Sequence, residues 1–190
     1  MRHPKRSIRL LGLMAVLCLG TAGRAAAQHA GVIEGRVDAK GPVAVYLTGA
    51  GTAPEAGAQV AIRQLNKAFL PAHLSAPQGA ELLLPNEDPV MHNVYSPSGV
   101  LGFKDMGVAN RTKADQSNLL RQPLAETGIV HLACAIHPAM EGLVFVVPSR
   151  FHQVSEDGTY RFEQLPPGQY ALWMMDREGH AHSLGPVEAF

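Results

Sequence analysis

The chain has 190 residues, 46% of them apolar, which is enough for one domain of ordinary size or for one domain with a small companion. Its 16 basic and 16 acidic side chains cancel, so it lacks the strongly basic character of nucleic-acid-binding proteins, and we expect no nucleic-acid partner. Charged residues make up only 17%, while 19 glycines and 14 prolines are typical of loop-rich β proteins rather than of helical bundles.

The N-terminal segment has the three parts of a secretory signal peptide. A basic stretch, Met1–Arg9, precedes an apolar run, Leu10–Gly20, and the small residues Ala25-Ala26-Ala27 then form a cleavage signal. The apolar run is shorter than the roughly 20 residues that a bilayer-spanning helix needs. We therefore expect residues 1–27 to be a cleaved signal peptide, an uncleaved anchor being the alternative. The mature protein, 28–190, is then periplasmic, has no transmembrane span and carries 11 basic and 16 acidic residues, a net charge of −5.

The elements expected after the signal are short strands separated by turns. In chain order the expected strands are 33–37, 43–47, 60–62, 82–84, 129–134, 143–147, 159–165 and 170–174. The run Val43–Leu47 is β-branched and aromatic and is typical of a buried strand, and residues 48–57, rich in Gly and Pro, read as a linker or long loop. Modest helix propensity is found at 111–122, without a clean apolar stripe. Many short strands with frequent turns predict an all-β sandwich.

The motif that carries chemistry is Cys134-Ala135-Ile136-His137-Pro138-Ala139-Met140. It offers a thiol, an imidazole and a thioether within seven residues, between one expected strand and the next. The three side chains therefore lie on one tight loop at one end of the sandwich, where they can converge. A second imidazole, His92, comes from a turn that leads into another short strand.

These four side chains are the ligand set of a blue-copper electron-transfer site. A thiolate is soft and favours copper, two neutral imidazoles complete a trigonal plane, and a weak axial thioether tunes the reduction potential. Because Cys18 leaves with the signal, Cys134 would be alone in an oxidising compartment, where a cysteine is buried and inert, reactive, or bound to a metal. We predict one type 1 copper ion bound by His92, Cys134, His137 and Met140. Zinc suits the set less well, because there is no CxxC pair and methionine is a poor zinc ligand. The competing interpretation treats each of the four as ordinary core or surface packing.

The sequence resembles the cupredoxins, and its C-x2-H-x2-M loop has the short spacing of amicyanin. More closely, it resembles the plastocyanin-like proteins called methylamine utilization proteins in bacteria. The matching text includes 64–71 (QLNKAFLP), 84–88 (LPNED), 92–96 (HNVYS) and the cysteine motif, and the resemblance covers most of 31–175. It implies a Greek-key β-sandwich, the four copper ligands named above, and a hydrogen bond through which Asn93 braces the two ligand loops. It also implies that a redox partner docks at the exposed imidazole edge of His137.

The two ends of the chain call for extra strands. Residues 157–174 (DGTYRFEQLPPGQYALWM) resemble the last hairpin of carboxypeptidase regulatory-like, or transthyretin-like, sandwiches. We expect N-terminal strands and a linker at 28–57, a cupredoxin domain at 58–148, and a β-hairpin tail at 149–190 that pairs with 31–47. The alternative is one continuous sandwich with additional edge strands.

The function expected from these features is that of an exported one-electron carrier. A periplasmic copper carrier or chaperone, and a β-sandwich binding or scaffold module without metal, are the alternatives. We expect no enzyme, because no G-x-S-x-G, phosphate-binding loop, H-E-x-x-H or plausible carboxylate dyad occurs.

Overall fold

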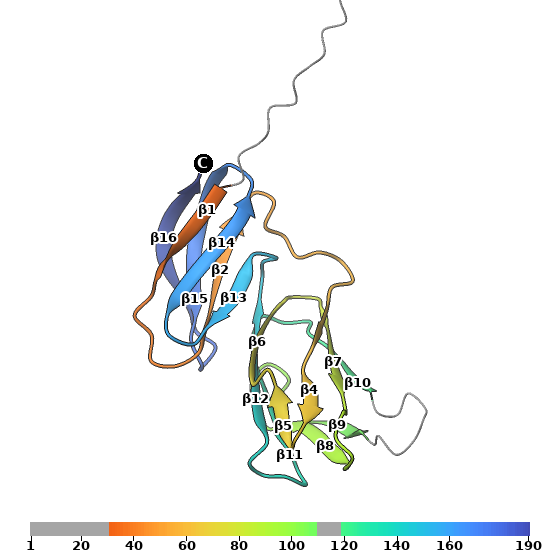
Figure 1. Cartoon of the computed structure of the whole chain (residues 1–190). Helices are drawn as coiled ribbons and strands as arrows, with labels where there is room; N and C mark the ends of the chain where they lie inside the picture. The colour runs from red at the N-terminus through yellow and green to blue at the C-terminus, as the bar shows by residue number, and fades with distance from the viewer. Residues whose placement is uncertain (1–30, 110–118) are drawn as a thin grey trace, which may run out of the picture.

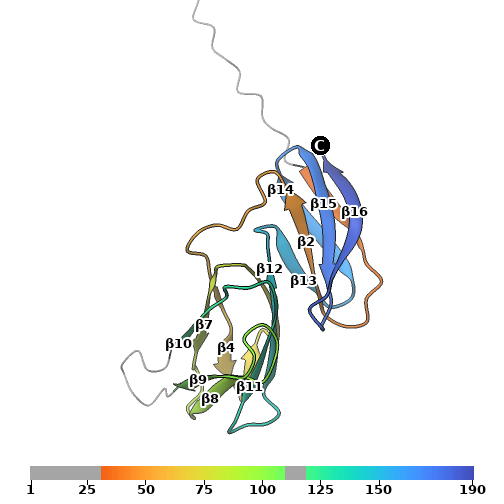
Figure 2. The ribbon, with the colours of Figure 1, turned by 180° about the vertical axis from the view of Figure 1, so that it is seen from behind.

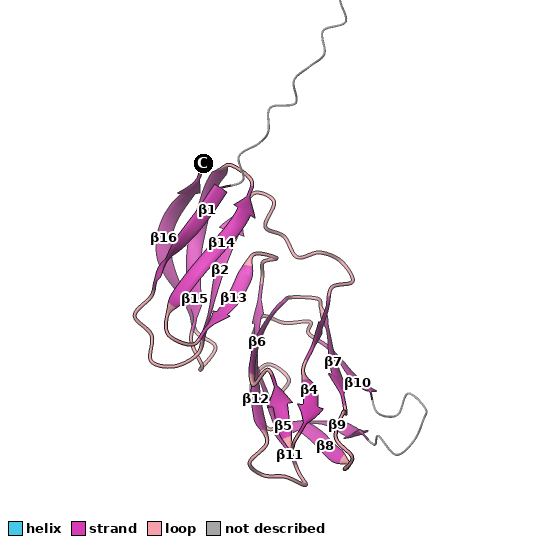
Figure 3. Ribbon diagram, viewed as in Figure 1, coloured by secondary structure: helices cyan, strands magenta, loops and turns pink. Residues whose placement is uncertain are grey.

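The computed structural model describes residues 31–109 and 119–190, so the predicted signal peptide lies outside the described residues. Within these two ranges every regular element is a β-strand and none is a helix (Figure 3), which confirms the expected all-β class. No helix with the length and hydropathy of a membrane crossing occurs in the described ranges.

The first sandwich holds the predicted metal loop, and its two sheets enclose one apolar core (Figure 1). The five-stranded sheet has the order β6(His73–Pro77), β12(Glu141–Val147), β11(Gly128–Cys134), β8(His92–Ser96) and β9(Lys104–Ala109). The three-stranded sheet has the order β10(Leu119–Pro123), β7(Glu81–Pro85) and β3(Gln59–Ala61). A separate hairpin, β4(Arg63–Leu65) and β5(Ala68–Leu70), contributes the fully buried Phe69 to the same core.

The second sandwich is built from strands at both ends of the chain (Figure 1). A four-stranded sheet has the order β13(His152–Ser155), β2(Val43–Gly49), β15(Gly168–Met175) and β16(Ala181–Ala189). A two-stranded sheet of β1(Gly31–Arg36) and β14(Thr159–Leu165) encloses a second core with it. The pairing of β1 with β14, and of β2 with β13 and β15, is consistent with the expected association of the terminal strands. The exact domain limits at 58 and 148 remain predictions.

Two strands, β2 and β12, are buried on both faces, and side chains of both belong to a third core that joins the sandwiches. Figure 2 shows β2 in the second sandwich and β12 in the first. Alternate residues of β2, Val43, Val45 and Leu47, face the second core, while Ala44 and Tyr46 face the junction. In β12, likewise, Val144 and Val146 face the first core, whereas Leu143, Phe145 and Val147 face the junction. Such strands need apolar residues at every position, which is why both read as continuous apolar runs rather than as alternating ones.

The stretch at 111–122 is not a helix where the structure describes it. Residues 119–122 belong to β10, which pairs with β7 so that Leu120 lies opposite Leu84. Leu120 packs against the first core, and Gln122 is buried. Strand pairing and packing override a modest local helix propensity here; residues 111–118 lie outside the described residues.

A polar contact accompanies the apolar junction. The Nδ1 atom of His152 on β13 lies 2.8 Å from the hydroxyl oxygen of Ser75 on β6. Burial lowers the pKa of His152 from its ordinary value of 6.5 to about 4. The folded protein therefore keeps this imidazole neutral at pH values where the unfolded chain would protonate it.

We expect the free energy of unfolding to fall by about 2–3 kcal/mol between pH 7 and pH 4.5 because of His152. The sign follows from the lowered pKa: the stabilisation is complete above pH 6.5 and is lost as the pH falls toward 4. Urea unfolding at both pH values tests this, with His152→Gln as the comparison. The variant should lose this part of the pH dependence, and an identical dependence in both proteins would contradict the assignment.

Candidate metal centre

Two adjacent strands and one turn bring the predicted ligands together. His92 begins β8 and Cys134 ends β11, and these strands pair so that Cys134 lies opposite Val94. His137 lies in the turn between β11 and β12, where the amide of Met140 donates to its carbonyl oxygen at 2.9 Å. The C-x2-H-x2-M spacing is thus the length of a tight turn that leaves the end of one strand and enters the next.

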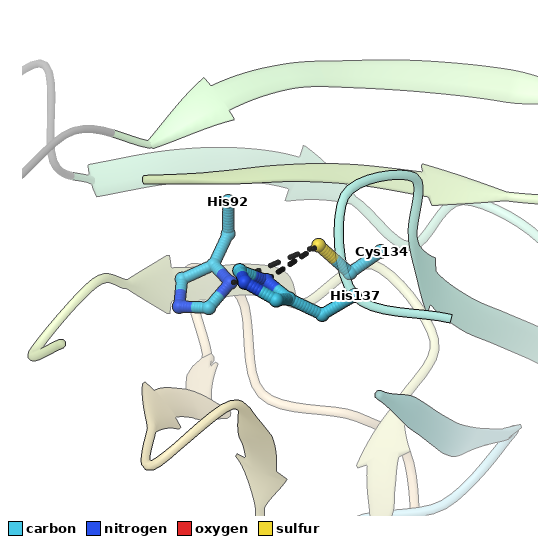
Figure 4. A group of neighbouring side chains, drawn as sticks. All are labelled: His92, Cys134 and His137. Atoms are coloured by element: carbon cyan, nitrogen blue, oxygen red, sulfur yellow. Dashed lines mark hydrogen bonds between the residues drawn. The ribbon is translucent and has the colours of Figure 1, made fainter. Parts of the chain in front are cut away.

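The potential metal-ligand atoms of three side chains point toward one another and lie close together (Figure 4). The Nδ1 atoms of His92 and His137 are 3.1 Å apart, and the Sγ atom of Cys134 lies 3.7 Å from the first and 3.8 Å from the second. Among the described residues these three form the one group of three or more His, Cys, Asp or Glu side chains that could hold a metal ion.

The triangle of these three atoms has the size of a metal site. The point in its plane that is equidistant from the three atoms lies about 2.1 Å from each, and metal–nitrogen and metal–sulfur bonds in proteins are about 2.0–2.3 Å long. Two imidazole nitrogens and one thiol sulfur are the donors that copper prefers. The residues present therefore fit a small, soft or borderline metal ion.

The centre is largely shielded from water. His92 is 0% exposed and Cys134 is 2% exposed, while His137 is half-buried. Removal from water, followed by the nearby imidazole of His92, lowers the pKa of His137 below its ordinary value. A lowered pKa leaves the ring neutral, which is the state that binds a metal.

Met140 and Asn93 were also predicted from sequence. Met140 is 1% exposed and belongs to the same apolar core as Cys134. The side-chain amide of Asn93 donates to Asp105 on β9 at 3.2 Å, and the Asn93 carbonyl accepts a hydrogen bond from the Ala135 amide at 3.0 Å, which links the two ligand segments. Successive residues of a strand point to opposite faces, so Asn93 points outward when His92 points inward. The hydrogen bond of Asn93 that links the two ligand segments is therefore one between backbone groups.

Asp88 is a functional candidate that sequence reasoning missed. One of its carboxylate oxygens lies 2.8 Å from Nε2 of His92, and the side chain is nearly fully buried. Burial raises the pKa of this carboxyl, but hydrogen bonds from the Lys67 amide, the His92 ring and the Asn66 amide outweigh that effect, and the net pKa lies below the ordinary value. The sequence feature that could have identified Asp88 is its position four residues before the predicted ligand His92, within the segment Asn86-Glu87-Asp88.

Comparison with known proteins gives only distant likenesses. No family model matches the chain, and no curated protein matches it. Among solved structures, a reduced variant of amicyanin is 22% identical, with a TM-score of 0.42, over 54% of this chain and 99% of amicyanin. A second reduced variant is 19% identical, with a TM-score of 0.42, over 54% of this chain and 98% of that one. An oxidised variant is 21% identical, with the same TM-score, over 54% and 99%.

Proposed function

We propose that this protein binds one copper ion through His92, Cys134 and His137, with Met140 as a weak fourth ligand, and carries one electron between redox partners. The observation that supports this most is the convergence of two imidazole nitrogens and one thiol sulfur at bonding distance from a common point. Bound there, copper would supply a one-electron couple between Cu(II) and Cu(I).

The chain's own residues suit a centre that changes little on electron transfer. His92 and Cys134 lie on strands that pair with one another, and the turn that carries His137 is closed by its own backbone bond. The packed core around Cys134 and Met140 resists displacement of either side chain. Ligands held in this way would move little when a bound copper ion changes between Cu(II) and Cu(I).

The burial of the ligands also favours an electron carrier over a copper carrier. A protein that hands copper to a partner needs ligands that the partner can reach, yet His92, Cys134 and Met140 are each at most 2% exposed. The order Asp88, His92, Cys134 is also that of a hydrolytic acid–base–thiol triad, but a thiol buried to this extent cannot meet a substrate carbonyl.

Copper titration of the purified mature protein tests the proposal. We expect one equivalent to give intense visible absorption that bleaches on reduction, returns on oxidation, and decays slowly in the presence of a strong chelator. A colourless adduct would contradict the type 1 assignment, and rapid loss of copper to the chelator would favour the copper carrier.

We further propose that the protein is periplasmic and that its redox partner docks at the His137 face. Exposed apolar side chains lie in the two ligand segments, namely Val90 and Met91 before His92 and Ile136, Pro138 and Ala139 beside His137. A small apolar surface of this kind suits brief encounters, which bury less than about 1,200 Å².

A negative charge at this face should slow electron exchange. We expect Ala139→Glu to lower the second-order rate with a redox partner by about tenfold or more, because the new carboxylate must lose its water in the interface. The copper spectrum should be nearly unchanged. Ala125→Glu is the matched control, since Ala125 is exposed and precedes the other end of β11. Equal exchange rates in the two variants would rule out docking at His137.

A further inference from the structure

We propose that Asp88 is a positioning residue of this centre: it fixes the tautomer of His92 that leaves Nδ1 unprotonated and able to bind a metal, and with copper bound it would lower the reduction potential. The inference rests on the proposed copper function, but its structural part concerns the metal-free protein as well. It follows from the bonds that Asp88 makes on both sides, to His92 and to the β4–β5 hairpin.

The bond to His92 decides which ring nitrogen carries the proton. The Asp88 carboxylate accepts hydrogen bonds from two backbone amides, that of Asn66 at 2.6 Å and that of Lys67 at 2.8 Å, in addition to its contact with His92. A carboxyl group surrounded by donors in this way acts as an acceptor, so Nε2 of His92 must be the protonated nitrogen. In a neutral ring Nδ1 then keeps its lone pair, and this is the atom that faces Cys134 and His137.

The position of Asp88 is itself fixed by its surroundings. Asn66 and Lys67 occupy the tip of the hairpin with φ of 55° each, a left-handed conformation that is uncommon for lysine and that aims two successive amides at one carboxylate. The Asp88 amide donates to the side-chain oxygen of Asn86 at 2.9 Å, and the Asn86 side chain donates in turn to the carbonyls of Val90 and Ala109. Asp88 therefore cannot turn away from His92 without breaking the bonds that hold the hairpin tip.

The effect of Asp88 on the reduction potential follows from how strongly Nδ1 of His92 would donate electrons to a bound copper ion. A carboxylate that accepts the Nε2 proton makes Nδ1 a stronger donor, and such partners of a metal-binding histidine typically change metal affinity by 10–100-fold. A stronger imidazole donor stabilises Cu(II) more than Cu(I). Loss of the carboxylate should therefore raise the potential, by about 59 mV for each tenfold loss in the preference for Cu(II).

The test combines a variant with a measurement on the unaltered protein. Asp88→Asn is nearly isosteric but removes the charge, and we expect it to bind copper, to stay coloured and to have a higher reduction potential than the parent. Glu87→Gln is the control, because it removes the same charge from the neighbouring residue, whose side chain contacts Arg63. Equal potentials in the two variants would overturn the role of Asp88.

Nitrogen NMR of the His92 ring in the metal-free parent keeps the inference testable even if Asp88→Asn does not fold. We expect the ring to be protonated at Nε2 and unprotonated at Nδ1, and a ring protonated at Nδ1 would overturn the inference. This result does not depend on copper. If the parent protein failed to form a copper centre, the proposed function would be rejected, and the NMR signals of the His92 ring would still decide whether Asp88 positions that ring.

Discussion

Replacing Cys134 with serine should abolish the intense visible absorption of the copper-loaded protein. That absorption arises from charge transfer between a thiolate and Cu(II), and a serine hydroxyl is a harder and much poorer donor. The substitution exchanges one sulfur atom for a smaller oxygen atom beside the rings of His92 and His137, so the sandwich should still fold. Visible spectra of parent and variant at equal Cu(II) occupancy measure the effect.

Ala133→Ser is the matched control for this experiment. It introduces the same hydroxyl one residue earlier on β11, where the side chain points to the opposite face of the sheet. The control should retain the parent spectrum. If Cys134→Ser also retained it, the thiol would not be a ligand and the assignment of the site would be wrong.

Replacing Phe145 with alanine should destabilise the protein by about 3–5 kcal/mol. Phe145 is 0% exposed and lies in the core between the two sandwiches, together with Tyr46 and Met175. Truncation leaves a cavity lined by strands of both sandwiches, and neither can close it without moving relative to the other. Because Phe145 faces away from the core that contains Cys134, the copper spectrum should not change.

Denaturant unfolding of the Phe145→Ala variant measures this effect, and Phe103→Ala is the control. Phe103 is 79% exposed, so its truncation should change the free energy of unfolding by no more than about 0.5 kcal/mol. A loss below about 1 kcal/mol for Phe145→Ala would mean that the junction contributes little and that the sandwiches are only loosely joined.

The parts of the fold that could be predicted from sequence are those in which burial dictates residue type. The run Val43–Leu47 is continuously apolar because β2 is covered on both faces, and the pattern alone indicated a buried strand. β16, by contrast, was not expected, because it is an edge strand with mostly exposed residues and contains Gly185 and Pro186. Its existence depends on pairing with β15, and a strand defined by its partner leaves little trace in its own sequence.

The candidate site likewise has a part that could be predicted from the sequence and a part that could not. The turn from Cys134 to Met140 could be predicted because its donors are close in sequence, and strand ends on either side fix where they lie. The spacing of Asp88 from His92 was a local signal, but the contacts that fix its carboxylate could not be predicted, because the amides of Asn66 and Lys67 lie 22 and 21 residues earlier and reach it only in the folded protein. Long-range backbone contacts of this kind have no sequence spacing from which they can be read.

The most direct measurement of the central claim is the position of copper in crystals of the copper-loaded protein, located by anomalous scattering at the copper absorption edge. The account predicts one strong peak within bonding distance of the His92 and His137 Nδ1 atoms and of the Cys134 Sγ atom. A peak elsewhere with this triangle empty, for example beside His182 and Asp176, whose Nε2 and Oδ2 atoms lie 2.7 Å apart, would contradict it.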